Sequence, residues 1–266
     1  MKKIATIGCG ALGTIFARAL VTRLSAEYLL LGVYDLNAES AGRLAGELNV
    51  KQYPDCGALL ADHPDIVVEI AGVPAVRAYG EMILRAGCDL VVVSVGALSD
   101  SALKDALERA ARENARKVYI VNGAIGGLDL MQTVAFMGVD EACITNVKAP
   151  ASLNGAPYLN GRELSEECEE VVFDGSVDEA IAGFPKNVNV AVATALASEF
   201  SGTRVVIKSV PGLPDNQHHI DLKGGGLTAR LSICSLPDPA NTKSSTSAAW
   251  SVIALLKNLA SPVQYF

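Results

Sequence analysis

Short apolar runs alternate with helical patterns through the first 121 residues, and this alternation constrains the fold more than any other feature. The runs are too short for buried helices and are rich in Val, Ile and Leu, as in fully buried strands. The stretches between them place apolar residues on one helical face. Repeated β-α units of this length predict an α/β fold with a doubly wound parallel sheet. The predicted strands are 4–7, 28–34, 66–70, 90–95 and 117–121, and the predicted helices are 11–24, 38–48, 74–86 and 101–113.

Beyond residue 121, turns rich in glycine and proline separate further strand-like runs. Residues 228–233 alternate polar and apolar side chains, which is typical of an antiparallel sheet with one face in water. We expect one helix within this half, at 187–200. A last amphipathic helix, at about 244–259, needs an apolar surface and is expected to pack back onto the first half. The predicted domains are 1–121 completed by 244–266, and an α+β domain at 122–243 with a mostly antiparallel sheet; its predicted strands are 144–148, 170–173, 204–209, 218–222 and 227–235.

Composition excludes several classes of function. The formal net charge of −7 and the absence of a basic run interleaved with aromatic residues oppose nucleic-acid binding. No apolar stretch approaches the roughly 20 residues of a membrane span, and the chain enters its first strand without the pattern of a signal peptide. The six cysteines form no Cys-x-x-Cys pair, and no zinc-ligand cluster is present. We therefore expect a soluble, cytoplasmic protein with reduced thiols and no metal site.

A glycine-rich turn follows the first predicted strand and opens the first predicted helix. Residues 8–13 read Gly-Cys-Gly-Ala-Leu-Gly and fit the spacing Gly-x-Gly-x-x-Gly. The first glycine permits a tight turn, the second lets a pyrophosphate approach the backbone, and the third allows close packing of helix on strand. Backbone N–H groups at the start of the helix attract phosphate. The motif predicts a Rossmann dinucleotide site, with turn glycines in an unliganded domain as the alternative; its residues are Gly8, Gly10, Ala11, Leu12 and Gly13.

Asp35 ends the second predicted strand, 22 residues beyond Gly13. An acidic residue at this place accepts hydrogen bonds from the adenosine ribose hydroxyls and repels a 2′-phosphate. The sequence therefore favours NAD over NADP. NADP is kept as an alternative, because Leu36 and Asn37 would not exclude the 2′-phosphate sterically.

Small residues follow two further strands, where ligands of open parallel sheets bind. We predict cofactor contacts at Ala71, Gly72, Ser94 and Ala97, although ordinary turn chemistry also explains these residues.

The chain has three histidines, and two of them are adjacent. His63 precedes Pro64 in a polar loop and is expected at the surface. His218 and His219 lie at the start of a predicted strand, so their side chains point to opposite faces and only one can face a given site. An imidazole titrates near neutral pH, which suits a group that takes a proton as hydride leaves. A solvated histidine at a strand edge fits the same spacing.

A polar segment precedes the last predicted helix. Lys243 and Ser244, together with the N-terminus of that helix, could hold a carboxylate. The alternative is that the serine only caps the helix.

The chain resembles the L-aspartate dehydrogenase family nearly from end to end. The glycine turn and the Gly-Ala-Ile-Gly-Gly-Leu-Asp and Phe-Pro-Lys-Asn-Val-Asn-Val-Ala segments carry much of the resemblance. The chain has Asn-Thr-Lys-Ser-Ser where the family usually reads Asn-Pro-Lys-Thr-Ser, and Gly-Gly-Gly-Leu where Gly-x-Phe-Gly is common. The matching segments are 8–13, 94–100, 122–129, 184–191, 216–220 and 241–245.

The resemblance implies NAD(P)-dependent oxidative deamination of L-aspartate to iminoaspartate, which yields oxaloacetate and ammonia. It also implies a homodimer, a catalytic His218, and cofactor contacts at Ala124 and Asn189. We expect the substrate at Asn187, His218, Lys243 and Ser244. Two alternatives stay open: a related dehydrogenase acting on another amino or imino acid, and a non-catalytic protein that binds NAD(H) as a sensor.

Overall fold

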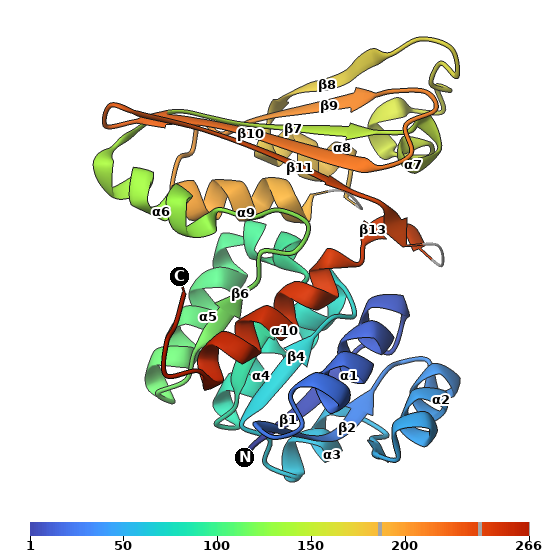
Figure 1. Cartoon of the computed structure of the whole chain (residues 1–266), viewed down its shortest axis with the longest axis vertical. Helices are drawn as coiled ribbons and strands as arrows, with labels where there is room; N and C mark the ends of the chain where they lie inside the picture. Colours follow the sequence, from blue (N-terminus) through green and yellow to red (C-terminus); the bar gives the residue numbers. More distant parts are fainter. Residues whose placement is uncertain (186–187, 239–240, 266) are drawn as a thin grey trace. The chain divides into compact units, whose positions relative to one another are not determined.

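The computed structural model describes residues 1–185, 188–238 and 241–265, except for the side chains of 237, 238 and 241–244. It divides the chain into two compact units (Figure 1). The first unit comprises Met1–Val121 and Ala248–Phe266, and the second comprises Asn122–Ser247. Among the described residues, no helix combines the length and the apolar character that crossing a bilayer requires.

A six-stranded parallel sheet forms the centre of the first unit. Its strand order, β3-β2-β1-β4-β5-β6, reverses direction between β1 and β4, as in Rossmann domains. The predicted doubly wound parallel sheet is confirmed, and a short strand, β3, is added at its edge. The strands are β1 (Lys2–Ile7), β2 (Tyr28–Tyr34), β3 (Lys51–Gln52), β4 (Ile66–Glu69), β5 (Asp89–Val92) and β6 (Val118–Ile120).

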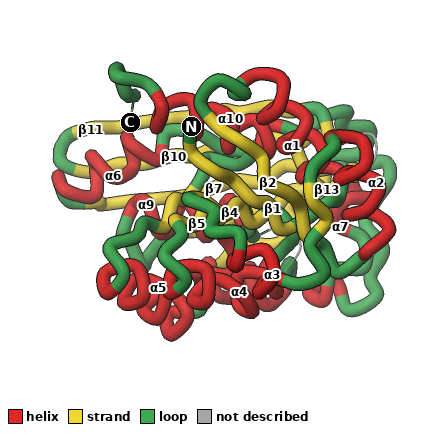
Figure 2. The backbone as a smooth tube through the Cα atoms, turned by 90° about the horizontal axis from the view of Figure 1, so that it is seen from below, coloured by secondary structure: helices red, strands yellow, loops and turns green. Residues whose placement is uncertain are grey.

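Helices cover both faces of this sheet. Figure 2 shows α1 and α10 on one side of the strands and α4 and α5 on the other. The predicted strand at 90–95 ends earlier, because residues 95–99 turn into a 3-10 helix, η1. The helices are α1 (Ala11–Arg23), α2 (Ala38–Leu48), α3 (Cys56–Ala61), α4 (Val73–Arg85), η1 (Val95–Ser99), α5 (Ser101–Glu113) and α10 (Ser247–Ala260).

The last helix, α10, completes the core of the first unit. Val252 and Leu256 are fully buried in the same cluster as Phe16 and Leu20 of α1. The Tyr28 hydroxyl donates a hydrogen bond to the Leu256 carbonyl at 2.8 Å. The predicted start at residue 244 was wrong: residues 241–245 pair as a strand, and the helix begins at Ser247.

The second unit is built on a five-stranded sheet of order β11-β10-β7-β9-β8. Only β7 and β9 pair in parallel, so the prediction of a mostly antiparallel sheet is confirmed. Two short strands form a separate hairpin. The strands are β7 (Val139–Lys148), β8 (Glu170–Ser176), β9 (Arg204–Ser209), β10 (Asn216–Gly224), β11 (Leu227–Ser235), β12 (Pro237–Asp238) and β13 (Asn241–Ser245).

Helices α6 and α9 lie along one face of this sheet (Figure 1). The prediction of a single helix in this half was wrong. Helix α8 carries a capping box, in which Ser176 and Glu179 satisfy each other's backbone N–H groups, and this signal was readable in the sequence. The α helices are α6 (Leu128–Met137), α7 (Pro150–Leu153), α8 (Val177–Gly183) and α9 (Asn189–Ser198), and a 3-10 turn, η2, covers Pro157–Leu159.

Candidate active site

The glycine turn sits where the strand order of the first sheet reverses, and two of its glycines are sterically required. Gly8 has φ +113°, and a Cβ there would lie 2.7 Å from the backbone carbonyl of Ile70 after β4. A Cβ on Gly13 would lie 2.0 Å from the Gly8 carbonyl oxygen. A Cβ on Gly10 would meet nothing within 4 Å. Gly8 and Gly13 therefore permit close backbone packing, and Gly10 leaves open space beside the turn.

The start of α1 and Asp35 fit the phosphate and ribose ends of a dinucleotide. Gly10, the residue before α1, has no side chain to cap the helix, so the N–H groups of Ala11 and Leu12 receive no capping side chain. One Asp35 carboxylate oxygen accepts the Cys9 N–H at 2.6 Å, and the other accepts the Asn37 N–H at 2.8 Å. Each oxygen keeps a second lone pair for a ribose hydroxyl. Asp35 thus holds the glycine turn against the end of β2, and its role as a ribose contact stays a prediction.

A buried glutamate ties together the two strand-end loops that carry Ala71, Gly72 and Ser94. Glu69 Oε1 accepts the N–H groups of Ala71 and Gly72 at 2.9 and 2.8 Å, and the Ser94 hydroxyl at 2.9 Å. Its Oε2 accepts the Ser94 N–H at 3.1 Å. Burial raises the pKa of Glu69, and these four donors oppose that shift. Sequence reasoning missed Glu69, because an acidic residue inside an apolar strand gives no sign of its partners.

The remaining cofactor predictions are placed as follows. Ala97 is buried within η1. Ala124 lies in the turn before α6, where the neighbouring Gly123 carbonyl accepts the Ser247 hydroxyl at 3.1 Å. Asn189 is the first residue of α9 and is exposed. None of these geometries tests a cofactor contact, and all three stay predictions.

In the second unit, His218 is a buried histidine with a defined partner. It is 3% exposed, and its Nδ1 lies 2.6 Å from Asn146 Oδ1 on the neighbouring strand β7. Because an amide oxygen only accepts, Nδ1 carries the proton and Nε2 keeps its lone pair. Burial, followed by the charges of Lys148 and His219, lowers the pKa of His218 to about 3. The imidazole is therefore neutral at physiological pH and can accept a proton only at Nε2.

The other two histidines have different surroundings. His219 points to the opposite face of the sheet, where its Nδ1 lies 3.0 Å from the Ser232 hydroxyl. His63 is exposed in its loop, with φ +51°. The histidine pair therefore behaves as the strand pattern predicts, with one member inside and one outside.

The predicted substrate residues are only partly described. Asn187 lies outside the described residues, and so do the side chains of Lys243 and Ser244, whose backbone belongs to β13. No group of three or more His, Cys, Asp or Glu side chains that could hold a metal ion occurs within the described parts of the chain.

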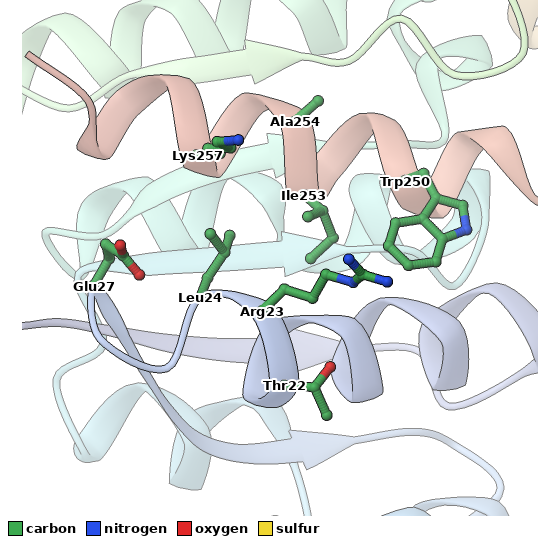
Figure 3. Close-up of a pocket in the computed structure, with 8 residues that line it drawn as sticks. All are labelled: Thr22, Arg23, Leu24, Glu27, Trp250, Ile253, Ala254 and Lys257. Carbon is green, nitrogen blue, oxygen red and sulfur yellow. The ribbon is translucent and has the colours of Figure 1, made fainter. Parts of the chain in front are cut away.

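A surface pocket of the first unit lies away from this chemistry. It is lined by the last turn of α1 and by α10, with the Arg23 guanidinium 5.6 Å from the Trp250 ring centre (Figure 3). Helix α1 starts at the carboxyl end of β1 and runs back along the sheet, so this pocket lies at the opposite end of the helix from the glycine turn. We assign it no part in dinucleotide binding.

Comparison with known proteins identifies the family. Residues 129–259 match the model of the C-terminal domain of aspartate dehydrogenase, and residues 8–121 match the NAD-binding domain of homoserine dehydrogenase. The L-aspartate dehydrogenases of Methanosarcina acetivorans and Methanocaldococcus jannaschii are 37% and 33% identical to the chain, with 99% of each protein covered. The chain belongs to the L-aspartate dehydrogenase family. It is an NAD(P)-dependent oxidoreductase.

Solved structures agree on the fold of this family member. An aspartate dehydrogenase from Thermotoga maritima superposes with a TM-score of 0.79 at 23% identity, covering all of both chains. A myo-inositol 2-dehydrogenase from Lactobacillus plantarum matches with a TM-score of 0.56 at 12% identity, covering 97% of this chain and 89% of its own. A Rossmann unit followed by a second, sheet-based unit is therefore shared well beyond the family.

Proposed function

We propose that the chain oxidises L-aspartate to iminoaspartate, which water converts to oxaloacetate and ammonia. The Cα–H bond breaks as its electron pair leaves with the hydrogen, and the nitrogen lone pair forms the C=N bond. Bound NAD(P) supplies the two-electron acceptor for this step. The observation that carries the proposal is the buried, neutral His218, held by Asn146 in a family whose relatives bear this activity in their names.

His218 is proposed to remove the proton from the substrate ammonium, because only a neutral amine has a lone pair to donate. The proton goes to Nε2, since Nδ1 already carries the hydrogen donated to Asn146. In the reverse direction, the imidazolium returns this proton to nitrogen. Asn146 is then a positioning residue that fixes the tautomer and the plane of the ring.

The cofactor is proposed to lie on the first unit, with its pyrophosphate at residues 8–13 and its adenosine ribose at Asp35. The open space beside Gly10 and the uncapped start of α1 support this assignment. We retain Ala124 and Asn189 as further proposed contacts. A carboxylate at Asp35 favours NAD, with NADP as the weaker cofactor.

We also propose that the protein is a homodimer, as the family resemblance implies, and that it works in the cytoplasm, where its six free cysteines stay reduced. Size-exclusion chromatography with light scattering tests the dimer: a mass near twice the 27.7 kDa of one chain is expected, and a monomer would refute it.

The test of the activity is the appearance of reduced nicotinamide when the purified protein receives L-aspartate and NAD. L-glutamate, L-alanine, D-aspartate and L-homoserine serve as competing substrates. We expect turnover with L-aspartate well above all four, and a loss of about 100-fold or more in kcat for His218→Gln. NADH binding without turnover of any amino acid would refute the proposal and favour an NAD(H)-binding sensor.

A further inference from the structure

The inner face of the second sheet changes from apolar to polar toward the carboxyl ends of β7 and β9. Ile144, Val205 and Leu222 fill the apolar part and are almost completely buried. The polar part is just as buried: Asn146, Lys148, Ser209, Asn216 and His218 are all no more than 5% exposed. The strand register places Lys148 beside Ser209 and Asn146 beside His218, and i, i+2 spacing puts Asn146 and Lys148 on one face.

The ammonium group of Lys148 is buried in this polar part of the sheet. Within the described part of the chain, no carboxylate lies within salt-bridge distance of its ammonium group, and Ser209 and Asn146 beside it are uncharged. Burying an unpaired charge is costly, and burial lowers the pKa of Lys148 to about 8. The group nevertheless stays protonated at neutral pH. An unpaired buried cation destabilises the fold, and a bound anionic ligand would offset that cost.

Neighbouring polar atoms also lack partners. Among the described side chains, Asn146 Nδ2 and Ser209 Oγ are buried with no hydrogen-bond partner. Both atoms can donate, as the Lys148 ammonium can. Among the described residues, three donors without acceptors thus lie on one face of one sheet, with Asn146 paired directly with His218 and Ser209 paired with Lys148. A carboxylate, which offers two oxygens and about four acceptor sites, matches this set.

We propose that Lys148, Ser209 and Asn146 form the binding site for one carboxylate of the substrate, adjacent to His218. This inference rests on the proposed function for the identity of the substrate, an amino dicarboxylic acid. In this proposal, the cation that binds the substrate carboxylate is Lys148 on strand β7. The sequence had suggested Lys243, in the polar segment before the last helix.

Substrate binding would also activate the base. The Lys148 charge is one of the causes that lower the pKa of His218, together with burial and His219. A carboxylate paired with Lys148 offsets that charge and adds a negative neighbour to the imidazole. Both effects raise the pKa of His218 once substrate is bound. The histidine therefore becomes a stronger base only in the complex that needs it.

The experiment compares Lys148→Met and Ser209→Ala with a matched control, Lys208→Met. Lys208 precedes Ser209 on β9 but is exposed, on the other face of the sheet. For Lys148→Met we expect the KM for L-aspartate to rise by about 30-fold or more, because a charged partner is lost. Its melting temperature should stay or rise, because methionine is buried without a charge. Ser209→Ala should raise the KM several-fold, and the control should leave it unchanged.

Calorimetric titration with succinate separates this inference from the proposed function. If the native chain turns over no aspartate but binds succinate, and Lys148→Met abolishes that binding, the carboxylate site stands while the proposed function fails. If the native chain oxidises aspartate and Lys148→Met keeps its KM within about twofold, the proposed function stands and this site is wrong. A native chain that binds no succinate, or an equal loss in Lys208→Met, also overturns it.

Discussion

Replacing Glu69 by Gln tests whether the two strand-end loops of the first unit are held by a buried carboxylate. In the native chain, its two oxygens accept four hydrogen bonds, from Ala71, Gly72 and both donors of Ser94. The glutamine amide has one oxygen and one nitrogen that only donates. In the best orientation of the glutamine side chain, its amide oxygen takes the place of Oε1 and accepts the same three hydrogen bonds. The new NH₂ group then takes the place of Oε2 and faces the Ser94 N–H.

The magnitude follows from that mismatch. The magnitude counts the one buried backbone donor that loses its acceptor, the N–H of Ser94. A buried unsatisfied group costs about 1–3 kcal/mol. For a chain of this size, 1 kcal/mol corresponds to roughly 2–4 °C, so the melting temperature should fall by about 2–12 °C. NADH should also bind more weakly, because the loops at its proposed site are loosened.

The control is Glu81→Gln, which breaks an exposed ion pair with Arg85 on α4. Such pairs contribute about 0–1 kcal/mol, so this variant should melt close to the native protein. Thermal unfolding by circular dichroism and NADH titration by fluorescence provide the two readouts. A Glu69→Gln protein that melts with the control and binds NADH with native affinity would refute the reasoning.

Three further predictions concern the glycine turn, the histidine and the lysine. Gly13→Ala places a Cβ 2.0 Å from the Gly8 carbonyl oxygen, so calorimetry should show NADH affinity lowered by about 10-fold or more, and native affinity would contradict the steric argument. His218 has a folded pKa of about 3 against an ordinary 6.5, so the unfolded chain binds more protons between these values and stability falls as pH drops through this window. When the free energy of unfolding is measured at decreasing pH, His218→Gln should lose less stability than the native chain, by up to roughly 1.4 kcal/mol per pH unit. Parallel curves for the two proteins would contradict the claim that His218 is buried in its neutral form. Above pH 8, Lys148 loses its proton in the free protein, so the KM for L-aspartate should rise with pH in the native chain and less in Lys148→Arg, whereas identical pH profiles would contradict the carboxylate site.

The first unit was predictable from sequence because its signals are local. The strand at 28–34 and the helices at 38–48 and 101–113 agree with the structure to the residue. The Asn37 cap, whose side chain accepts two N–H groups, and the Asp100 cap lie directly before these two helices. Here the cap and the apolar period indicate the same boundary, and no distant contact overrides them.

The second unit was less predictable because distant contacts decide more of it. Gly127, the residue before α6, has a left-handed backbone conformation and packs against Leu231 of β11, a contact that no local pattern shows. The candidate site has the same property. The family resemblance indicated His218, but Asn146 and Lys148 become visible only when β7 and β10 pair in register. In the sequence, the alternation of Asn146 and Lys148 at the end of the strand-like run 144–148 hinted at a polar site. A strand end exposed to solvent explains the same alternation equally well.

The most direct test of the central claim is the reaction run in reverse. Purified protein is mixed with oxaloacetate, ammonium and NADH, and the absorbance of reduced nicotinamide is followed, with mixtures lacking each component as controls. If the protein is an aspartate dehydrogenase, NADH is oxidised only when oxaloacetate and ammonium are both present, and L-aspartate is the product. Oxidation of NADH by oxaloacetate without ammonium, or none with all three components, would contradict the account.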